Sequence, residues 1–129
     1  MSTLKVNTIQ NASGGNASTV DNIQQGIAKA WVNFNGTFSS SSEDLRVDSF
    51  NVSGVTDNAT GIYTITFANN MANSNYVVNI SKRLNTTGGA TSSDDVITGL
   101  VNTAQTNTSV KVYTRNTDCI AVHVVVFGD

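Results

Sequence analysis

The sequence predicts an all-β protein: an antiparallel β-sandwich with an extended N-terminal arm and a short helix in that arm. Val and Ile number 16 and 8 against 4 Leu, a ratio that favours pleated strands over helices. Apolar and polar residues alternate along short runs, and clusters of Asn, Asp, Ser, Thr and Gly separate the runs. From residue 30 onward no segment has the length and periodicity of a helix, which is typical of a sandwich or barrel of short strands.

The N-terminal arm is expected to span residues 1–29. Residues 4–9 alternate briefly in the manner of a strand, with Leu4 and Val6 on one face. The NASGG run that follows predicts a flexible or tightly turned connector. Such a connector would let the β-domain lie at an angle to the protein that the arm binds. Because an isolated strand is marginal in water, residues 4–9 are expected to add to a sheet of another protein or of a sister subunit. The alternative is a disordered tail.

A short helix is expected to follow, with Thr19 or Asp21 as its N-cap. Ile23 and Ile27 are four residues apart and share one side of this helix. Gly26 weakens the helix by about 1 kcal/mol. A helix of about ten residues with so narrow an apolar stripe is not stable alone. It therefore needs a surface to lie on, either its own sheet or another subunit.

Residues 30–129 are expected to form the β-domain, with about seven strands bounded by turns. The alternating runs occupy 30–38, 45–55, 61–68, 76–84, 96–101, 109–115 and 119–127. The phase of the alternation changes at Phe50, which predicts a bulge or a bend within the second run. Turn-forming residues fill 56–61, and 85–95 is the longest run with no alternation.

The predicted core consists of apolar residues that alternate along these runs. They are Val32, Phe34, Phe50, Val52, Tyr63, Ile65, Phe67, Val78, Ile80, Val112, Val122, Val124 and Val126. The last run is apolar on both of its faces, which indicates either a central strand or a strand with one face buried by another subunit.

Composition excludes several classes of function. Seven Lys and Arg against nine Asp and Glu give a net charge of −2 with no basic cluster, so no nucleic-acid partner is expected. No apolar run approaches the roughly 20 residues of a membrane span, so no membrane insertion is expected. One cysteine cannot form an internal disulfide. Only 12% of residues are charged, and the polar surface comes instead from 17 Asn, 17 Thr and 14 Ser.

No set of residues points to catalysis or to a metal. The lone histidine, His123, is expected to be a core or interface imidazole bonded to a backbone carbonyl; the alternative is a metal site shared by subunits on a symmetry axis. Cys119 is expected to be an inert buried thiol. Four residues along a strand place it about 13 Å from His123, which is too far for the two to form a reactive Cys–His pair. The acidic pairs at 43–44 and 94–95 lie in loops, where solvated charges are usual, and carboxylate catalysis or calcium binding is the weaker alternative. The chain is expected to be no enzyme and to need no cofactor.

Four segments resemble a known family. The opening TLKVNTIQNASG, the stretches KAWVNFNGTF and VDSFNVSGVTDNATGIYTITFANNMANSNYVV, and the ending VHVVVFGD are similar to small tail-fibre and fibre-like virion proteins of phages, notably those that infect marine cyanobacteria. The resemblance covers most of the chain. It is most specific from Trp31 to Phe34 and from Phe50 to Phe67, and it does not extend to residues 85–95.

The resemblance implies a β-rich structural component of a phage particle, assembled in the host cytoplasm and without enzyme activity. It implies a homotrimer that attaches to other virion proteins through its N-terminal segment and displays its C-terminal β-domain. Polar loops on a rigid sandwich suit the binding of a glycan or protein of the host surface. The loop residues expected to be exposed for this purpose are Asp57, Asn58, Thr87, Thr91 and Asp94.

The residues of the arm also favour oligomerisation. Its apolar side chains are too few and too scattered to form a core, and their burial on neighbours stabilises by about 1.5–3 kcal/mol per large side chain. The expected interface residues are Leu4, Val6, Ile9, Ile23 and Ile27. A typical fibre has a shaft between its two ends, whereas here arm and domain adjoin. The alternative is therefore a capsid-decorating knob or a joining protein with no host ligand.

Overall fold

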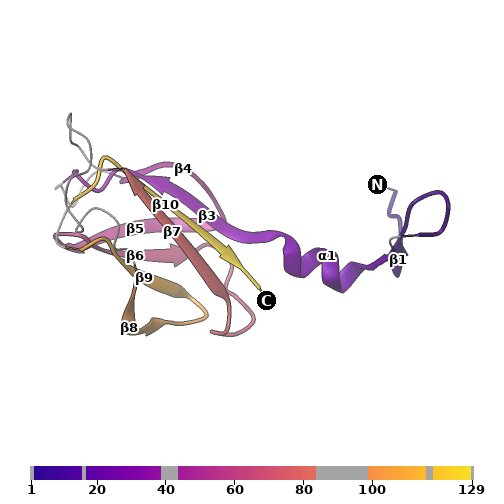
Figure 1. The fold of residues 1–129 in the computed structure, drawn as a ribbon. Coiled ribbons are helices and arrows are strands. Elements are labelled where there is room, and N and C mark those ends of the chain that lie inside the picture. Colours follow the sequence, from indigo (N-terminus) through magenta and orange to yellow (C-terminus); the bar gives the residue numbers. More distant parts are fainter. Residues whose placement is uncertain (1, 16, 39–43, 84–98, 116–117, 129) are drawn as a thin grey trace.

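Two four-stranded antiparallel sheets pack face to face, and the N-terminal arm projects from one end of them (Figure 1). The structure, a computed structural model, describes residues 2–15, 17–38, 44–83, 99–115 and 118–128. The predicted all-β sandwich is confirmed. We call the end of the sandwich that joins the arm the arm end, and the opposite end the far end.

Each sheet takes strands from both halves of the β-domain. The first sheet has the order β4 (Arg46–Phe50), β3 (Ala28–Phe34), β10 (Ala121–Phe127), β7 (Val77–Arg83). The second has the order β5 (Val52–Ala59), β6 (Ile62–Phe67), β9 (Ser109–Tyr113), β8 (Gly99–Gln105). The last strand, β10, lies between β3 and β7 and is central, as one of the two sequence interpretations proposed.

The core between the sheets is built from alternate residues of these strands, and all predicted core residues but one pack in it or against it. The prediction for Phe50 is wrong, because its side chain is 54% exposed. The chain turns at Asn51, which adopts a left-handed φ of 54° and carries the backbone from β4 in the first sheet to β5 in the second. The change of phase at Phe50 therefore marks a crossing between sheets rather than a bulge within one strand.

Two strands extend into segments that the sequence predicted as turns or loops. β5 continues to Ala59, because the whole stretch pairs with β6 and Asn58 Oδ1 accepts a hydrogen bond from Thr64 Oγ1 at 2.6 Å. β8 continues to Gln105, so residues 102–105 are strand rather than loop. In β5, pairing with β6 overrides the low β-propensity of Asn and Asp. In β8, Gln105 pairs with Val110 of β9 after an irregularity that follows Leu100.

The arm contains a two-stranded ribbon and a helix. β1 (Thr8–Ile9) pairs with β2 (Ser18–Thr19), and helix α1 follows at once from Val20–Gly26. Of the two predicted N-caps, Thr19 is the one used: its Oγ1 accepts from the backbone N–H of Asn22 at 3.2 Å.

The NASGG connector is a tight turn that closes this ribbon. Asn11 Oδ1 accepts hydrogen bonds from the Gly15 N–H at 2.8 Å and from Ser13 Oγ at 2.9 Å, and Gly14 takes a φ of 78° that other residues rarely adopt. The two glycines therefore lie within the arm. The tight turn is one of the two forms that the sequence predicted for this connector. The arm meets the β-domain at Ile27, between α1 and β3.

Candidate functional site

The surfaces that could engage partners lie at opposite ends of the molecule. The arm leaves the sandwich at the start of β3, while the turn between β5 and β6 lies at the far end (Figure 1). β7 finishes at the far end with Arg83, and β8 begins there with Gly99. The arm residues are thus separated from Asp57 and Asn58 by the full length of the sandwich.

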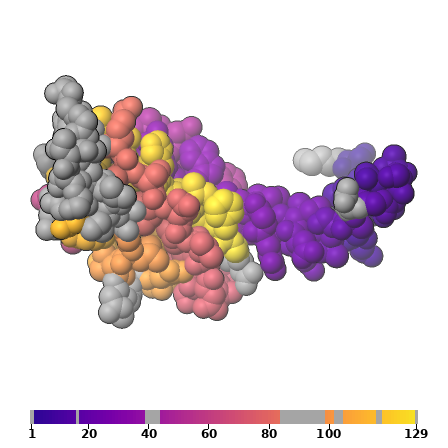
Figure 2. Space-filling view, in the orientation of Figure 1, coloured from indigo at the N-terminus to yellow at the C-terminus, as the bar shows by residue number. Residues whose placement is uncertain are grey.

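The arm presents its apolar side chains to solvent. Leu4 is 86% exposed, Ile9 and Ile27 are 55% exposed, and Ile23 is half-buried. Helix α1 buries none of its residues, and the space-filling view shows the arm standing clear of the sandwich (Figure 2). The expected interface residues are therefore not covered by the sheets of their own chain.

One recess forms where the ribbon meets the helix. It is lined by Val6, Asn7, Thr19, Val20 and Asp21. The backbone N–H of Val20 donates to the carbonyl of Asn7 at 3.2 Å, which holds the chain before β1 against the first turn of α1. Of the five expected interface residues, Val6 is the one that lines this recess.

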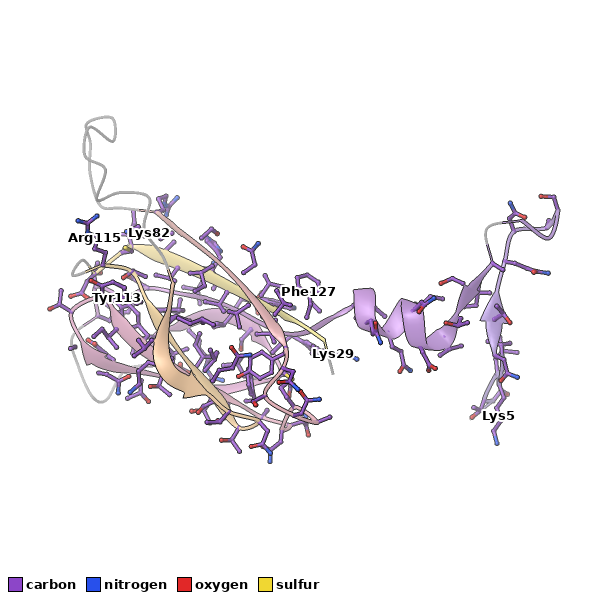
Figure 3. All side chains as sticks on the ribbon, turned by 60° about the horizontal axis from the view of Figure 1, so that its bottom comes forward. Lys5, Lys29, Lys82, Tyr113, Arg115 and Phe127 are labelled. Carbon is purple, nitrogen blue, oxygen red and sulfur yellow. The ribbon has the colours of Figure 1, made fainter. Side chains whose placement is uncertain are left out.

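At the far end, Asp57 and Asn58 are exposed near the end of β5, as the sequence predicted. Thr87, Thr91 and Asp94 lie outside the described residues. Among the side chains labelled in Figure 3, Lys82, Tyr113 and Arg115 come together at this same end. The Nζ of Lys82 donates to the backbone carbonyl of Thr114 at 2.9 Å, which links β7 of the first sheet to the end of β9 in the second.

A network of hydrogen bonds beneath the surface links the segments of the far end to one another. The Tyr63 hydroxyl donates to Asp118 Oδ1 at 2.8 Å, and the Gly61 N–H donates to the same oxygen at 2.8 Å. Tyr63 is fully buried on β6, so this carboxylate joins the β5–β6 turn to the segment that precedes β10. Two segments distant in sequence are thereby fixed to one another.

Gly36 completes this network through its small size. Its N–H donates to the Cys119 carbonyl at 2.8 Å, and its own carbonyl lies 3.2 Å from the Tyr63 hydroxyl. A Cβ at this position would meet the Tyr63 hydroxyl oxygen at 2.3 Å. The backbone after β3 can approach the ring of Tyr63 this closely only because residue 36 has no side chain.

Burial favours the neutral forms of Tyr63 and Cys119. Burial, and then the hydrogen bond to Asp118, raise the pKa of Tyr63. Burial is also the main cause that raises the pKa of the Cys119 thiol, which confirms the buried position expected for this cysteine. Desolvation and the nearby Asp118 charge raise the pKa of Asp57. Hydrogen bonding rather than nucleophilic attack is the chemistry that such groups offer.

His123 does not lie in the core. Its side chain is exposed on the outer face of β10, opposite the buried valines of that strand, so the core interpretation is wrong for this residue. Within the described ranges, no three His, Cys, Asp or Glu side chains come close enough to hold a metal ion. No helix in the described part of the chain is long and apolar enough to cross a membrane.

Sequence reasoning identified one surface only in part, the outer face of the first sheet. Trp31, Phe50, Val125, Phe127 and Val77 lie on it, and Phe50 was expected in the core instead. The signal for this surface was the second apolar face of the last strand. Comparisons of the chain with protein families, with curated proteins and with solved structures found no match.

Proposed function

We propose that this protein is a structural component of a bacteriophage particle, similar to a tail fibre, that is held by its N-terminal arm and displays its β-domain toward the host surface. The observation that carries the proposal is the position of the exposed apolar arm at one end of a rigid sandwich and of the exposed polar residues Asp57 and Asn58 at the other. The resemblance of the sequence to small fibre-like virion proteins supports the same assignment.

The arm suits attachment to another protein of the particle. Its ribbon has only two strands, β1 and β2, so each strand keeps one edge to which a further strand could add. Ile9 belongs to β1 and Leu4 precedes it. Both side chains are exposed and would be buried by such a contact. Each buried side chain of this size contributes about 1.5–3 kcal/mol.

The far end suits recognition of a polar surface such as a glycan. Asp57 and Asn58 are exposed there, at the end of β5 and next to the turn that Asp118 holds in place through the Gly61 N–H. A fixed turn loses little conformational entropy when it binds, so weak polar contacts can add to a useful affinity. The proposed assembly is a homotrimer, which would present three such ends side by side and strengthen binding by multivalency.

The test is incorporation into particles. The arm variant Leu4→Ser/Ile9→Ser is compared with Val47→Ser, a control that changes an exposed apolar residue on β4. We expect the arm variant to remain folded and to be missing from purified particles, while the control is incorporated at the normal copy number. If the arm variant is incorporated normally, the arm is not the anchor.

A second candidate function is a capsid-decorating or joining protein that binds no host ligand. The close connection between arm and domain favours it: β3 begins at Ala28, directly after helix α1 and the single residue Ile27. No shaft separates the two parts. Labelling the far end in intact particles distinguishes the candidates, because a fibre places the label on the tail and a decorating protein places it over the capsid lattice.

A further inference from the structure

The chain contains one Asn–Gly pair, Asn35–Gly36, which lies directly after β3 at the far end (Figure 1). None of the other 16 Asn residues is followed by Gly. In such a pair the backbone nitrogen of the glycine can attack the side-chain amide of the asparagine, because no Cβ hinders its approach. Asn is among the thermolabile residues of proteins, and Asn35 is the position in this sequence where the following residue hinders the reaction least.

The reaction of an Asn–Gly pair is deamidation. The Gly36 nitrogen attacks Asn35 Cγ and loses its proton, the new N–C bond closes a five-membered succinimide ring, and ammonia leaves as the bond from Cγ to the amide nitrogen breaks. Water then adds to one of the two ring carbonyls and opens the ring. The product is aspartate, or isoaspartate, in which the main chain runs through the former side chain and is one carbon longer.

Both reacting groups of this pair are engaged in other hydrogen bonds in the folded chain. The Gly36 N–H, whose proton must leave, donates to the Cys119 carbonyl at 2.8 Å. Asn35 Oδ1 accepts from the Thr37 N–H at 3.0 Å and from Thr37 Oγ1 at 2.8 Å, as in an Asx-turn. Ring closure requires the reacting atoms to approach with their orbitals aligned, so the peptide plane between the two residues must rotate until its nitrogen faces Cγ.

The surroundings of this peptide plane oppose the rotation. The Asn35 N–H donates to the Leu45 carbonyl at 2.9 Å, and the Gly36 carbonyl accepts from the Tyr63 hydroxyl at 3.2 Å. Gly36 is buried against the Tyr63 ring, where even an added Cβ would lie 2.3 Å from the hydroxyl oxygen. The plane is therefore bonded on both sides and has no free space beside Tyr63 into which it could turn.

We propose that Asn35 is a deamidation site that the folded far end keeps unreacted, and that opening of the far end exposes it to irreversible conversion. The protecting contacts are the hydrogen bonds of Gly36 to Cys119 and to Tyr63. Local opening of a structure precedes many reactions of buried groups, and its free energy sets their rate. The reaction needs water as its only co-reactant.

The isoaspartate product cannot restore the native far end. It adds one carbon to the main chain between residues 35 and 36, at a position where the backbone already approaches Tyr63 as closely as a glycine allows. The reaction would thus limit the lifetime of the far end. This inference does not depend on what the far end binds.

The test compares deamidation of the full chain in buffer and in guanidinium chloride above its unfolding transition, at the same pH and temperature. Tryptic cleavage after Lys29 and Arg46 releases residues 30–46, and mass spectrometry of this peptide detects the exchange of amide for carboxyl. Asn33 lies in the same peptide and is followed by the bulky Phe34, so it is the internal control. We expect Asn35 to react in the unfolded chain ahead of Asn33, and at least about tenfold more slowly in the folded chain.

Two tyrosine variants test the protecting contacts. Tyr63→Phe removes the hydroxyl that holds the Gly36 carbonyl and is expected to accelerate the reaction of the folded chain by about tenfold. The matched control is Tyr76→Phe, because Tyr76 is also buried and donates to a backbone carbonyl, but at the arm end. The control is expected to react at the wild-type rate when folded. In guanidinium chloride all three chains are expected to react equally fast.

Three outcomes would overturn the proposal. Equal rates for the folded and the unfolded wild-type chain show that the fold gives no protection. A stable Asn35 in the unfolded chain shows that the pair is not a reactive site. If Tyr76→Phe accelerates the reaction as much as Tyr63→Phe, or if neither does, the contacts of Gly36 at the far end do not provide the protection. Normal incorporation of the arm variant into particles would contradict the proposed function without changing these rates.

Discussion

At the scale of single residues, the far end depends on one buried carboxylate contact. Tyr63 and Tyr76 are both buried and both donate through their hydroxyls, but to different acceptors. Tyr63 donates to the Asp118 carboxylate, whereas Tyr76 donates to the backbone carbonyl of Thr106 at 2.8 Å. Hydrogen bonds to charged groups contribute about 1.5–3 kcal/mol and those between neutral groups about 0.5–1.5 kcal/mol.

The first prediction compares the two tyrosines. We expect Tyr63→Phe to lower the free energy of unfolding by about 1.5–3 kcal/mol and Tyr76→Phe by about 0.5–1.5 kcal/mol. Urea denaturation of both variants measures the difference. Equal losses for the two variants would show that the Asp118 contact carries no additional stabilisation.

A second prediction at this scale concerns the ion pair of Asp44 and Arg46. The guanidinium Nε donates to the two carboxylate oxygens at 2.8 and 2.9 Å, and this hydrogen bonding lowers the pKa of Asp44. A lowered carboxyl pKa contributes stability above the ordinary Asp value of about 4, and that stability is lost as the pH falls through the folded value. The Asp44 and Arg46 side chains are 51% and 26% exposed, so water screens the pair and its contribution is about 0.2–1 kcal/mol.

We therefore expect Asp44→Asn to lower the free energy of unfolding by that small amount at neutral pH and to have no effect in strong acid. Asp48→Asn changes the net charge equally and lies on the adjacent strand β4, so it serves as the control. Chemical denaturation across the acid range measures both. A loss that persists unchanged in strong acid would contradict the role of the ion pair.

At the scale of elements, the sequence predicts strands well where one face of the strand is buried. It predicts them poorly where only backbone pairing with a neighbouring strand makes the segment a strand. Val32 and Phe34 in β3, or Tyr63 and Ile65 in β6, alternate with polar residues and are buried as expected. β8 lacks such alternation beyond residue 101, because its place at a sheet edge needs only backbone pairing. The β1–β2 ribbon was missed for a similar reason: two residues on each side are too few to show a period.

Asn51, the link between β4 and β5, shows why the crossing between sheets was also missed. The sequence showed that the phase of alternation changes but not that the chain leaves one sheet for the other. Asn51 Oδ1 accepts from the Asn69 N–H at 2.7 Å and its Nδ2 donates to the Lys29 carbonyl at 3.0 Å. These partners are 18 and 22 residues away along the chain, and no local pattern reports contacts of that range.

The third prediction follows from the two roles of Asn51. Asn51→Gly removes the hydrogen bonds but tolerates the φ of 54°, whereas Asn51→Ala removes the bonds and adds the strain of a left-handed residue. We expect both variants to be destabilised, with alanine worse than glycine by about 1 kcal/mol. Thermal unfolding of the pair measures this difference. Equal stability of the two variants would mean that the backbone turn imposes no strain.

At the scale of the whole molecule, the sequence predicts an arm and a β-domain but not the full set of apolar residues on the outer face of the first sheet. The arm residues were identified because they are apolar and too scattered to form a core. The outer apolar residues alternate with core residues in the same strands, so they resemble core residues when a single strand is considered. Only the register of three strands shows that Trp31, Phe50 and Val125 share one face.

The last prediction is that arm and sandwich are thermodynamically separate. Helix α1 buries no residue, and the ribbon residues of β1 are exposed, so removal of residues 1–20 takes almost no surface from the core. We expect the truncated chain to unfold with a melting temperature within about 2 °C of the full chain, because a change of 1 kcal/mol shifts it by roughly 4 °C in a domain of this size. Leu45→Ala is the contrasting variant: Leu45 is 4% exposed, and its truncation is expected to cost about 2–5 kcal/mol. Calorimetry at equal concentration measures the melting temperatures of the full chain, the truncated chain and Leu45→Ala. A drop in the truncated chain as large as that of Leu45→Ala would show that the arm folds back on the sandwich in solution, and the arm would then be part of the β-domain rather than a separate segment available for attachment.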